Sequence, residues 1–426
     1  MAEPAPRAFA AATVLATSLA FALVVGPAWE TMNHAGAQGG VLYLLCYGAG
    51  LACVAVPLLL LELQLGRRGD MTLPAGLDRL VQRLEAPGAW RWLGGAQRLV
   101  LLLLSAPVLM LLGAALRAVV TLAQGQPAAL VLDVPVAAPS LESELSGVLA
   151  ALAVLAGLLW CAARSPTGAV QRGLALMFLG VLGTLAVLAA ADLLADPVRL
   201  AGARAGFAWP DASSRSLAML AGAVAAGALS LLAGSGVYVA AGGRLPVAGT
   251  LGRLLGMVLV AQLFLLLVTM SLQGAPGAGL LPARYLAAAV CVLVLLAASL
   301  ALLQLMAPLM HWMSQRFEVS AGSAGVLILT LCWMLSMVGV LGHGDWQSVR
   351  VLDRSLLETA IWVGREVLLP GAALGWILFV GWGAQREVMT IRDLRPVLTA
   401  PWRLMIRYLT PVLLVICVLR MAAPPS

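Results

Sequence analysis

The apolar run that begins at Ala8 is interrupted by Gly26-Pro27 and continues to about residue 36. A run of this kind is long enough to cross the hydrocarbon core of a bilayer, which takes about 20 apolar residues. A break at membrane depth leaves backbone N–H and C=O groups without helical partners, and lipid supplies none. The broken run is therefore expected to be covered by protein or to line a water-filled cavity.

The composition extends this conclusion to the whole chain. Of its 426 residues, 62% are hydrophobic and only 11% are charged, so an all-α polytopic membrane protein is expected. Because the first apolar run continues through its break, it does not have the form of a cleaved signal peptide. We expect about eleven transmembrane spans, with boundaries good to a few residues, near 8–36, 40–66, 90–120, 147–163, 169–195, 215–242, 248–273, 285–314, 322–342, 357–383 and 401–421.

The arginines predict the orientation in the membrane. With the N-terminus in the cytoplasm, 17 of the 26 arginines fall on the inner side, as the positive-inside rule requires. An odd number of spans then places the C-terminus outside, in a multi-pass protein of the plasma (inner) membrane. The net charge of +7 is explained by this orientation and does not predict a nucleic-acid partner. The expected partners are the lipid bilayer and a small-molecule substrate.

The sixth span contains a second candidate break at Gly234-Ser235-Gly236. Glycine is also common where membrane helices cross closely, so packing is an equal alternative for this cluster taken alone. Its position favours a break, because interrupted helices at positions one and six are what a five-plus-five inverted repeat produces. No nucleotide loop, metal cluster or ordered nucleophile and base is found, so an enzyme is not expected.

The segment from Val24 to Gly69 resembles the start of the neurotransmitter:sodium symporter family. The matching positions are Gly26, Trp29, Gly39, Gly40, Tyr47, Pro57, Glu62 and Gly66. The resemblance implies a leucine-transporter-like fold in one domain over 1–426, with repeats at about 8–195 and 215–383 and an extra helix at about 401–421. It also implies secondary-active transport of a small, amino-acid-like solute by alternating access, nominally as a sodium-dependent symporter. No cofactor is expected other than possible Na⁺.

The same resemblance implies a binding site between spans one, three and six. Its substrate wall would consist of Val24, Gly26, Pro27, Trp29, Val108, Leu232, Gly234, Ser235 and Gly236. Its ion positions would be Leu23, Ser230 and Ser299. The chain departs from the family by having Pro27 where an asparagine is usual and no tyrosine on span three. The alternative is therefore an uncoupled, proton-coupled or non-transporting, sensor-like descendant that has lost the sodium sites.

Charged residues suggest two further assignments. Glu30 replaces the family's gate arginine, so an exchanged gate is expected with Arg365 on span ten, where Glu358 shares the same helical face, or with Arg354 just before that span. The alternative is that Glu30 faces a wet vestibule and needs no partner. Glu62 is expected to pair with Arg67 and Arg68, and a proton site is the alternative.

Overall fold

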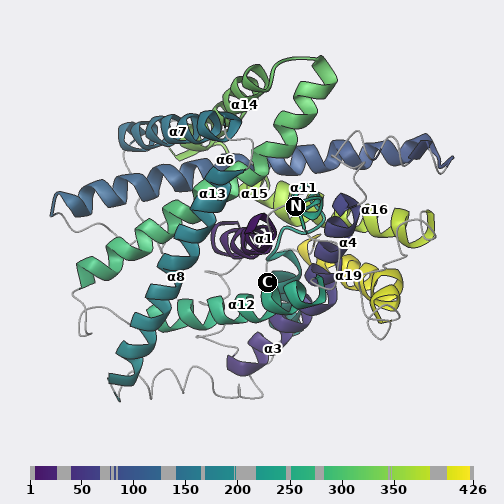
Figure 1. Cartoon of the computed structure of the whole chain (residues 1–426), viewed down its shortest axis with the longest axis horizontal. Coiled ribbons are helices and arrows are strands. Elements are labelled where there is room, and N and C mark those ends of the chain that lie inside the picture. The colour runs from purple at the N-terminus through teal and green to yellow at the C-terminus, as the bar shows by residue number, and fades with distance from the viewer. Residues whose placement is uncertain are drawn as a thin grey trace.

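The chain was analysed as a computed structural model (Figure 1), which describes residues 5–25, 40–67, 77, 81–82, 85–125, 141–164, 168–195, 197, 217–245, 251–273, 283–343, 346, 348–383 and 401–422. Nearly all of these residues are helical. Within them, extended pairing is confined to one bridge between Val351 and Arg354.

Nine described helical segments are long and apolar enough to cross a membrane, and two shorter apolar segments lie at Ala10–Val24 and Met219–Leu229. The all-α polytopic fold is therefore confirmed, and the shorter segments belong to the spans predicted to be broken. The helices that the structure describes are α1 (Ala5–Val24), α3 (Gly40–Gly50), α4 (Val56–Arg67), α6 (Trp92–Ala123), α7 (Leu141–Arg164), α8 (Ala169–Ala195), α10 (Leu217–Leu229), α11 (Val239–Gly242), α12 (Leu251–Gln273), α13 (Ala283–Phe317), α14 (Ala321–His343), α15 (Leu356–Ile361), α16 (Leu369–Leu378) and α19 (Thr410–Ala422). The division into two repeats stays a prediction.

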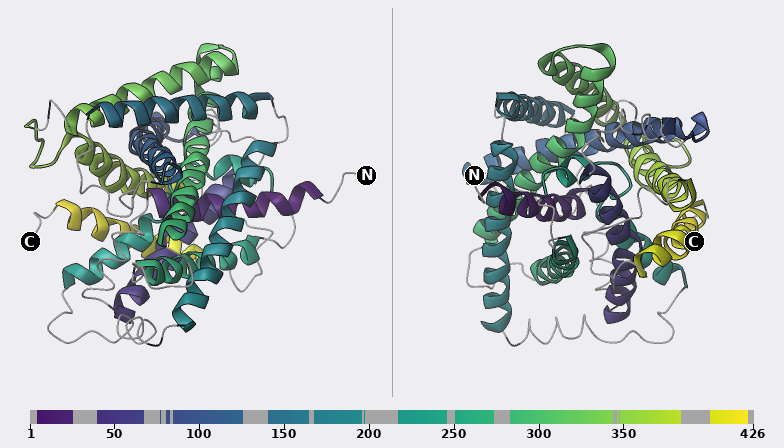
Figure 2. Two further views of the ribbon diagram at one scale, coloured as in Figure 1. Left: turned by 90° about the vertical axis from the view of Figure 1, so that its left-hand side faces the viewer. Right: turned by 45° about the vertical axis from the view of Figure 1, so that its right-hand side comes forward.

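Spans one, six and eight form the interior of the bundle. Helix α1 lies near the middle of the view in Figure 1 and packs against α8, α12 and α13. Figure 2 shows the same bundle from two further sides. In the most apolar window of α13, 72% of the residues are buried, whereas the corresponding share for α7 is 22%. This contrast separates a protein-covered centre from helices whose apolar side chains face outward, as expected for a protein in lipid.

Glycines bring spans two and six into backbone contact. A Cβ at Gly50 would collide with the Val224 carbonyl, and one at Gly227 would collide with the Tyr47 carbonyl. Farther along the same pair of spans, Gly66 lies against the carbonyl of Val239 and Gly242 against that of Leu63. Small residues allow such close crossings in membrane proteins. The close approach places α4 directly beside the break between α10 and α11.

Several spans contain π-helical turns, at η2 (Leu51–Ala55), η5 (Trp362–Leu368), η6 (Phe379–Gly383) and η7 (Met405–Leu409). A π turn displaces the regular hydrogen-bond ladder and is frequent at functional sites. In η2, the carbonyl of Cys53 accepts a hydrogen bond from the Thr410 hydroxyl at 2.8 Å. Span eleven therefore satisfies a backbone group in the irregular part of span two.

The packing of span two predicts the outcome of a matched pair of substitutions. Gly50→Ala should lower the melting temperature of the detergent-solubilised protein, because the new Cβ would overlap the Val224 carbonyl, and overpacking costs about 1–3 kcal/mol. Gly48→Ala is the control, since the nearest atom to its Cβ would be Leu263 Cδ2 at 3.8 Å. Equal melting temperatures for the two variants would contradict the close crossing.

Candidate functional site at the break in span six

Span six is interrupted between the end of α10 at Leu229 and the start of α11 at Val239. Gly234 has φ +100° and Gly236 has φ +87°, values that only glycine adopts readily. Leu232 also lies in the left-handed region, with φ +51°, where a residue with a Cβ is strained by about 1–2 kcal/mol. The Gly-Ser-Gly cluster is therefore a real break, and the packing alternative is insufficient to explain it.

The carboxylate of Glu62 on α4 fills the concave side of this break. Its Oε1 accepts from the backbone N–H of Gly234 at 2.6 Å and of Gly236 at 2.8 Å, and its Oε2 accepts from the N–H of Tyr238 at 3.0 Å. Alternating backbone conformations point these N–H groups the same way and form a concavity that suits an anion. Glu62 is only 4% exposed, so these bonds balance the burial of its polar atoms.

The carbonyls of the break are also satisfied by side chains. Gln97 on α6 donates from Nε2 to the Gly234 carbonyl at 2.9 Å, and the Tyr238 hydroxyl donates to the Leu231 carbonyl at 2.9 Å. Gly234 is therefore held at its N–H by span two and at its C=O by span three. Two elements distant in sequence thus define the shape of the break.

The partner expected for Glu62 from the sequence is corrected by this geometry. Three backbone N–H groups surround the carboxylate in place of Arg67 and Arg68, the second of which lies outside the described residues. Sequence reasoning placed Glu62 next to its neighbours along the helix. The N–H groups of the broken helix have no other partner at membrane depth. They therefore need the carboxylate as an acceptor more than the arginine side chains do.

The end of the first half of span one lies next to the break. The rings of Phe21 on α1 and Tyr238 meet edge to face, with centroids 6.2 Å apart. Helix α1 ends at Val24, two residues before Gly26. The predicted wall residues Gly26, Pro27 and Trp29 lie outside the described residues. The described parts of spans one and six are thus in contact where the sequence placed the two breaks.

The remaining predicted wall residues are mostly apolar and buried. Val108 and Leu232 belong to one buried cluster, and Val24 packs against it. Gly234 lies against Ala373 of α16, so span ten contributes to the same region. Two buried polar atoms of this region, Ser235 Oγ and Gln97 Oε1, have no hydrogen-bond partner. Because such atoms are normally paired, both are candidates for contact with a ligand.

The predicted ion positions are buried but offer few oxygen atoms. Ser230 donates its hydroxyl to the Gly227 carbonyl of its own helix at 2.9 Å. Leu23 and Leu300 belong to an apolar cluster where α1 meets α13, and beside it Ser299 Oγ is buried without a hydrogen-bond partner. The binding of Na⁺ here stays a prediction.

The structure gives Glu358 a local role that the predicted gate did not include. Its Oε2 accepts from the Ser355 N–H at 2.9 Å and its own N–H bonds to Ser355 Oγ, which makes it the capping box of α15. The expected common face with Arg365 assumed an unbroken α-helical period. The π turn η5 begins at Trp362 and disrupts that period between the two residues. Glu30 lies outside the described residues.

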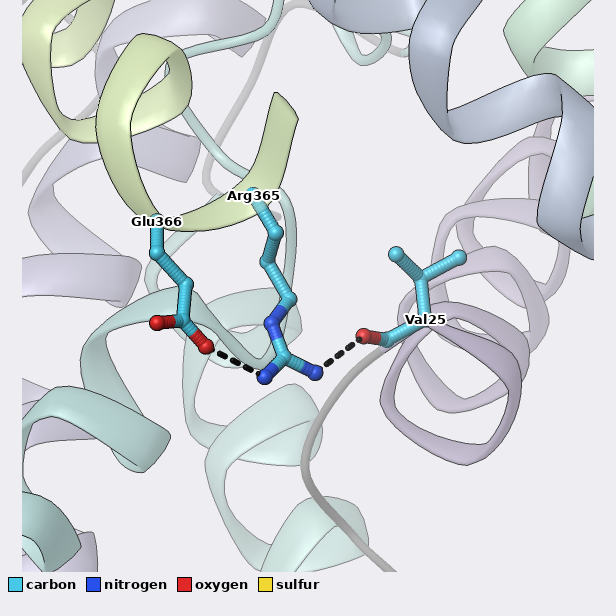
Figure 3. Close-up of polar contacts among 3 residues, drawn as sticks. All are labelled: Val25, Arg365 and Glu366. Atoms are coloured by element: carbon cyan, nitrogen blue, oxygen red, sulfur yellow. Dashed lines mark hydrogen bonds and ion pairs between the residues drawn. The ribbon is translucent and has the colours of Figure 1, made fainter. Parts of the chain in front are cut away.

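Arg365 bridges span ten and the end of α1, as Figure 3 shows, and its predicted gate with Glu30 stays a prediction. Its Nη1 donates to the Val25 carbonyl at 3.4 Å, and its Nη2 is 2.7 Å from Glu366 Oε1. Sequence reasoning named Arg365 but did not find Val25, Glu366 or Gln97 as partners. Only the presence of single polar residues in apolar spans could have singled out Gln97 and Glu366.

Comparison with known proteins identifies the architecture. The crystal structure of MhsT in complex with L-phenylalanine superposes with a TM-score of 0.74 at 19% identity, covering 96% of this chain and 98% of that chain. The chain has the fold of MhsT. The leucine-transporter-like fold expected from the sequence is thereby confirmed. No protein-family model matches the chain, and the search of curated proteins found no match.

The hydrogen bonds of Glu62 can be tested on the purified protein. Glu62→Gln should lower the melting temperature, because an amide NH₂ would face backbone donors, and a hydrogen bond to a charged group contributes about 1.5–3 kcal/mol. Gln64→Leu is the matched control on the same helix, since Gln64 is 6% exposed and its Nε2 has no partner. A loss in the control as large as in Glu62→Gln would contradict the assigned role.

Proposed function

We propose that this chain is a secondary transporter that moves a small, largely apolar organic solute across the membrane by alternating access. The observation that carries the proposal is the break of span six, whose backbone is hydrogen-bonded by Glu62 and Gln97 and lies beside the end of α1. In transporters, substrate sites lie at broken helices near the bilayer midplane. The match in fold to MhsT over nearly the whole chain supports this assignment.

The lining of the site favours a solute without net charge whose surface is mostly apolar. Val108 and Leu232 supply apolar surface, while Ser235 Oγ and Gln97 Oε1 are polar atoms without partners. Burying an ionised group against such walls would be unfavourable unless it were paired. MhsT was crystallised with L-phenylalanine, so hydrophobic amino acids are the first substrates to test.

Sodium coupling is the nominal mechanism implied by the family resemblance, and loss of coupling is the second candidate. Na⁺ binds to oxygen atoms, but the described ion positions offer the hydroxyls of Ser230 and Ser299 beside leucine side chains. The Ser230 hydroxyl donates to its own helix. This scarcity of free oxygens favours a carrier that does not depend on Na⁺.

Flux in proteoliposomes tests the proposal. Uptake of labelled L-phenylalanine should exceed that of empty liposomes, should saturate, and should be similar in the presence and absence of an inward Na⁺ gradient. Ser235→Ala is expected to raise the KM, because it removes a polar atom available to the ligand, whereas Ser323→Ala at an exposed position is the control. If no hydrophobic amino acid is bound or transported, the proposed substrate class is wrong.

The proposed orientation makes a separate prediction. With a cytoplasmic N-terminus and eleven crossings, a reporter fused after Ser426 should lie outside the cytoplasm. Paired fusions of a periplasm-active enzyme and a cytoplasm-active fluorescent protein would measure this. If the fluorescent fusion is fluorescent and the enzyme fusion is inactive, the predicted orientation or the number of spans is wrong.

A further inference from the structure

The end of the first half of span one presents a carbonyl that requires a positive partner. Val25 follows the last residue of α1, and its N–H still bonds to the Phe21 carbonyl at 2.9 Å. The last carbonyls of a helix have no partner within the helix and lie at the negative end of its dipole. At membrane depth such carbonyls are satisfied by protein donors or by bound cations.

Arg365 supplies that partner from span ten. Its guanidinium reaches from η5 to the Val25 carbonyl (Figure 3), at a distance of 3.4 Å. The Arg365 side chain is 13% exposed. An arginine inside a membrane span is unfavourable unless its charge is paired or solvated. Guanidinium remains charged in proteins, so this position permanently holds one positive charge.

Glu366 compensates the charge without displacing the guanidinium from span one. Adjacent residues do not face each other on an α-helix, yet Arg365 Nη2 is 2.7 Å from Glu366 Oε1 within the π turn. Nη1 and Nη2 of the guanidinium thus each contact an acceptor, one on span one and one on span ten. The planar fork of arginine allows this division, which the single ammonium of lysine reproduces poorly.

We propose that Arg365 is a built-in cation that occupies the broken end of span one and replaces a soluble inorganic cation there. The inference deepens the proposed function, because it explains how alternating access could proceed without Na⁺ at this end. Only the consequence of this inference for transport rests on the proposed function. The replacement itself is a binding property of the protein and can be measured without flux.

The test measures thermal unfolding of the full-length purified protein without substrate, in NaCl and in choline chloride at equal ionic strength. The wild type should melt at the same temperature in both salts. Arg365→Ala should melt lower, and adding guanidinium chloride in place of choline chloride should raise its melting temperature, since a ligand that binds the native state stabilises it. Glu366→Ala is the control, because it leaves the guanidinium on Val25 and should show no rise with guanidinium.

Three results would overturn the proposal. The first is a melting temperature of the wild type that is higher in NaCl than in choline chloride. The second is a melting temperature of Arg365→Ala equal to that of the wild type. The third is a melting temperature lowered as much in Glu366→Ala as in Arg365→Ala, with guanidinium raising neither. If Arg365→Ala does not fold, Arg365→Lys and Arg365→Met decide, since the charged variant should melt higher than its neutral counterpart, and equal melting would refute the role of the charge. Absence of transport would leave these results unaffected.

Discussion

Three N–H groups in the break of span six have lost their helical partners, and the carboxylate of Glu62 accepts hydrogen bonds from all of them. Each such group left unsatisfied away from water would be unfavourable by several kcal/mol. The left-handed residues that create the break are thus stable only with this acceptor in place. The carboxylate in turn is buried only because these donors surround it. Neither feature could exist in the membrane without the other.

Glycine brings the two spans close enough for these bonds. Gly66 lies one turn after Glu62 on the same helical face, and its missing side chain lets α4 approach the Val239 carbonyl at the start of α11. Gly50 and Gly227 allow the same approach between α3 and α10. Larger residues at these positions would separate the helices and move the carboxylate away from the break. The small residues therefore determine the geometry of the site without touching a ligand.

The two broken ends are stabilised by charges of opposite sign that belong to the protein. Donors exposed in span six meet the Glu62 carboxylate, and the carbonyl exposed at the end of α1 meets the Arg365 guanidinium. In the proposed transporter, both charges remain in place while the solute binds. The proposed lack of dependence on Na⁺ agrees with the apolar surroundings of Leu23, one of the predicted ion positions.

The sequence by itself determined the membrane class, the approximate limits of the spans and the place of the break in span six. These follow from the length of apolar runs and from a local glycine cluster, which are properties of one segment at a time. Tertiary structure alone decided that Glu62 faces span six rather than Arg67, that Gln97 holds Gly234, and that Glu358 caps α15 while Arg365 reaches Val25. Those partners depend on which helices cross at small residues and on a π turn that interrupts the helical period, and neither can be read from periodicity within a single span.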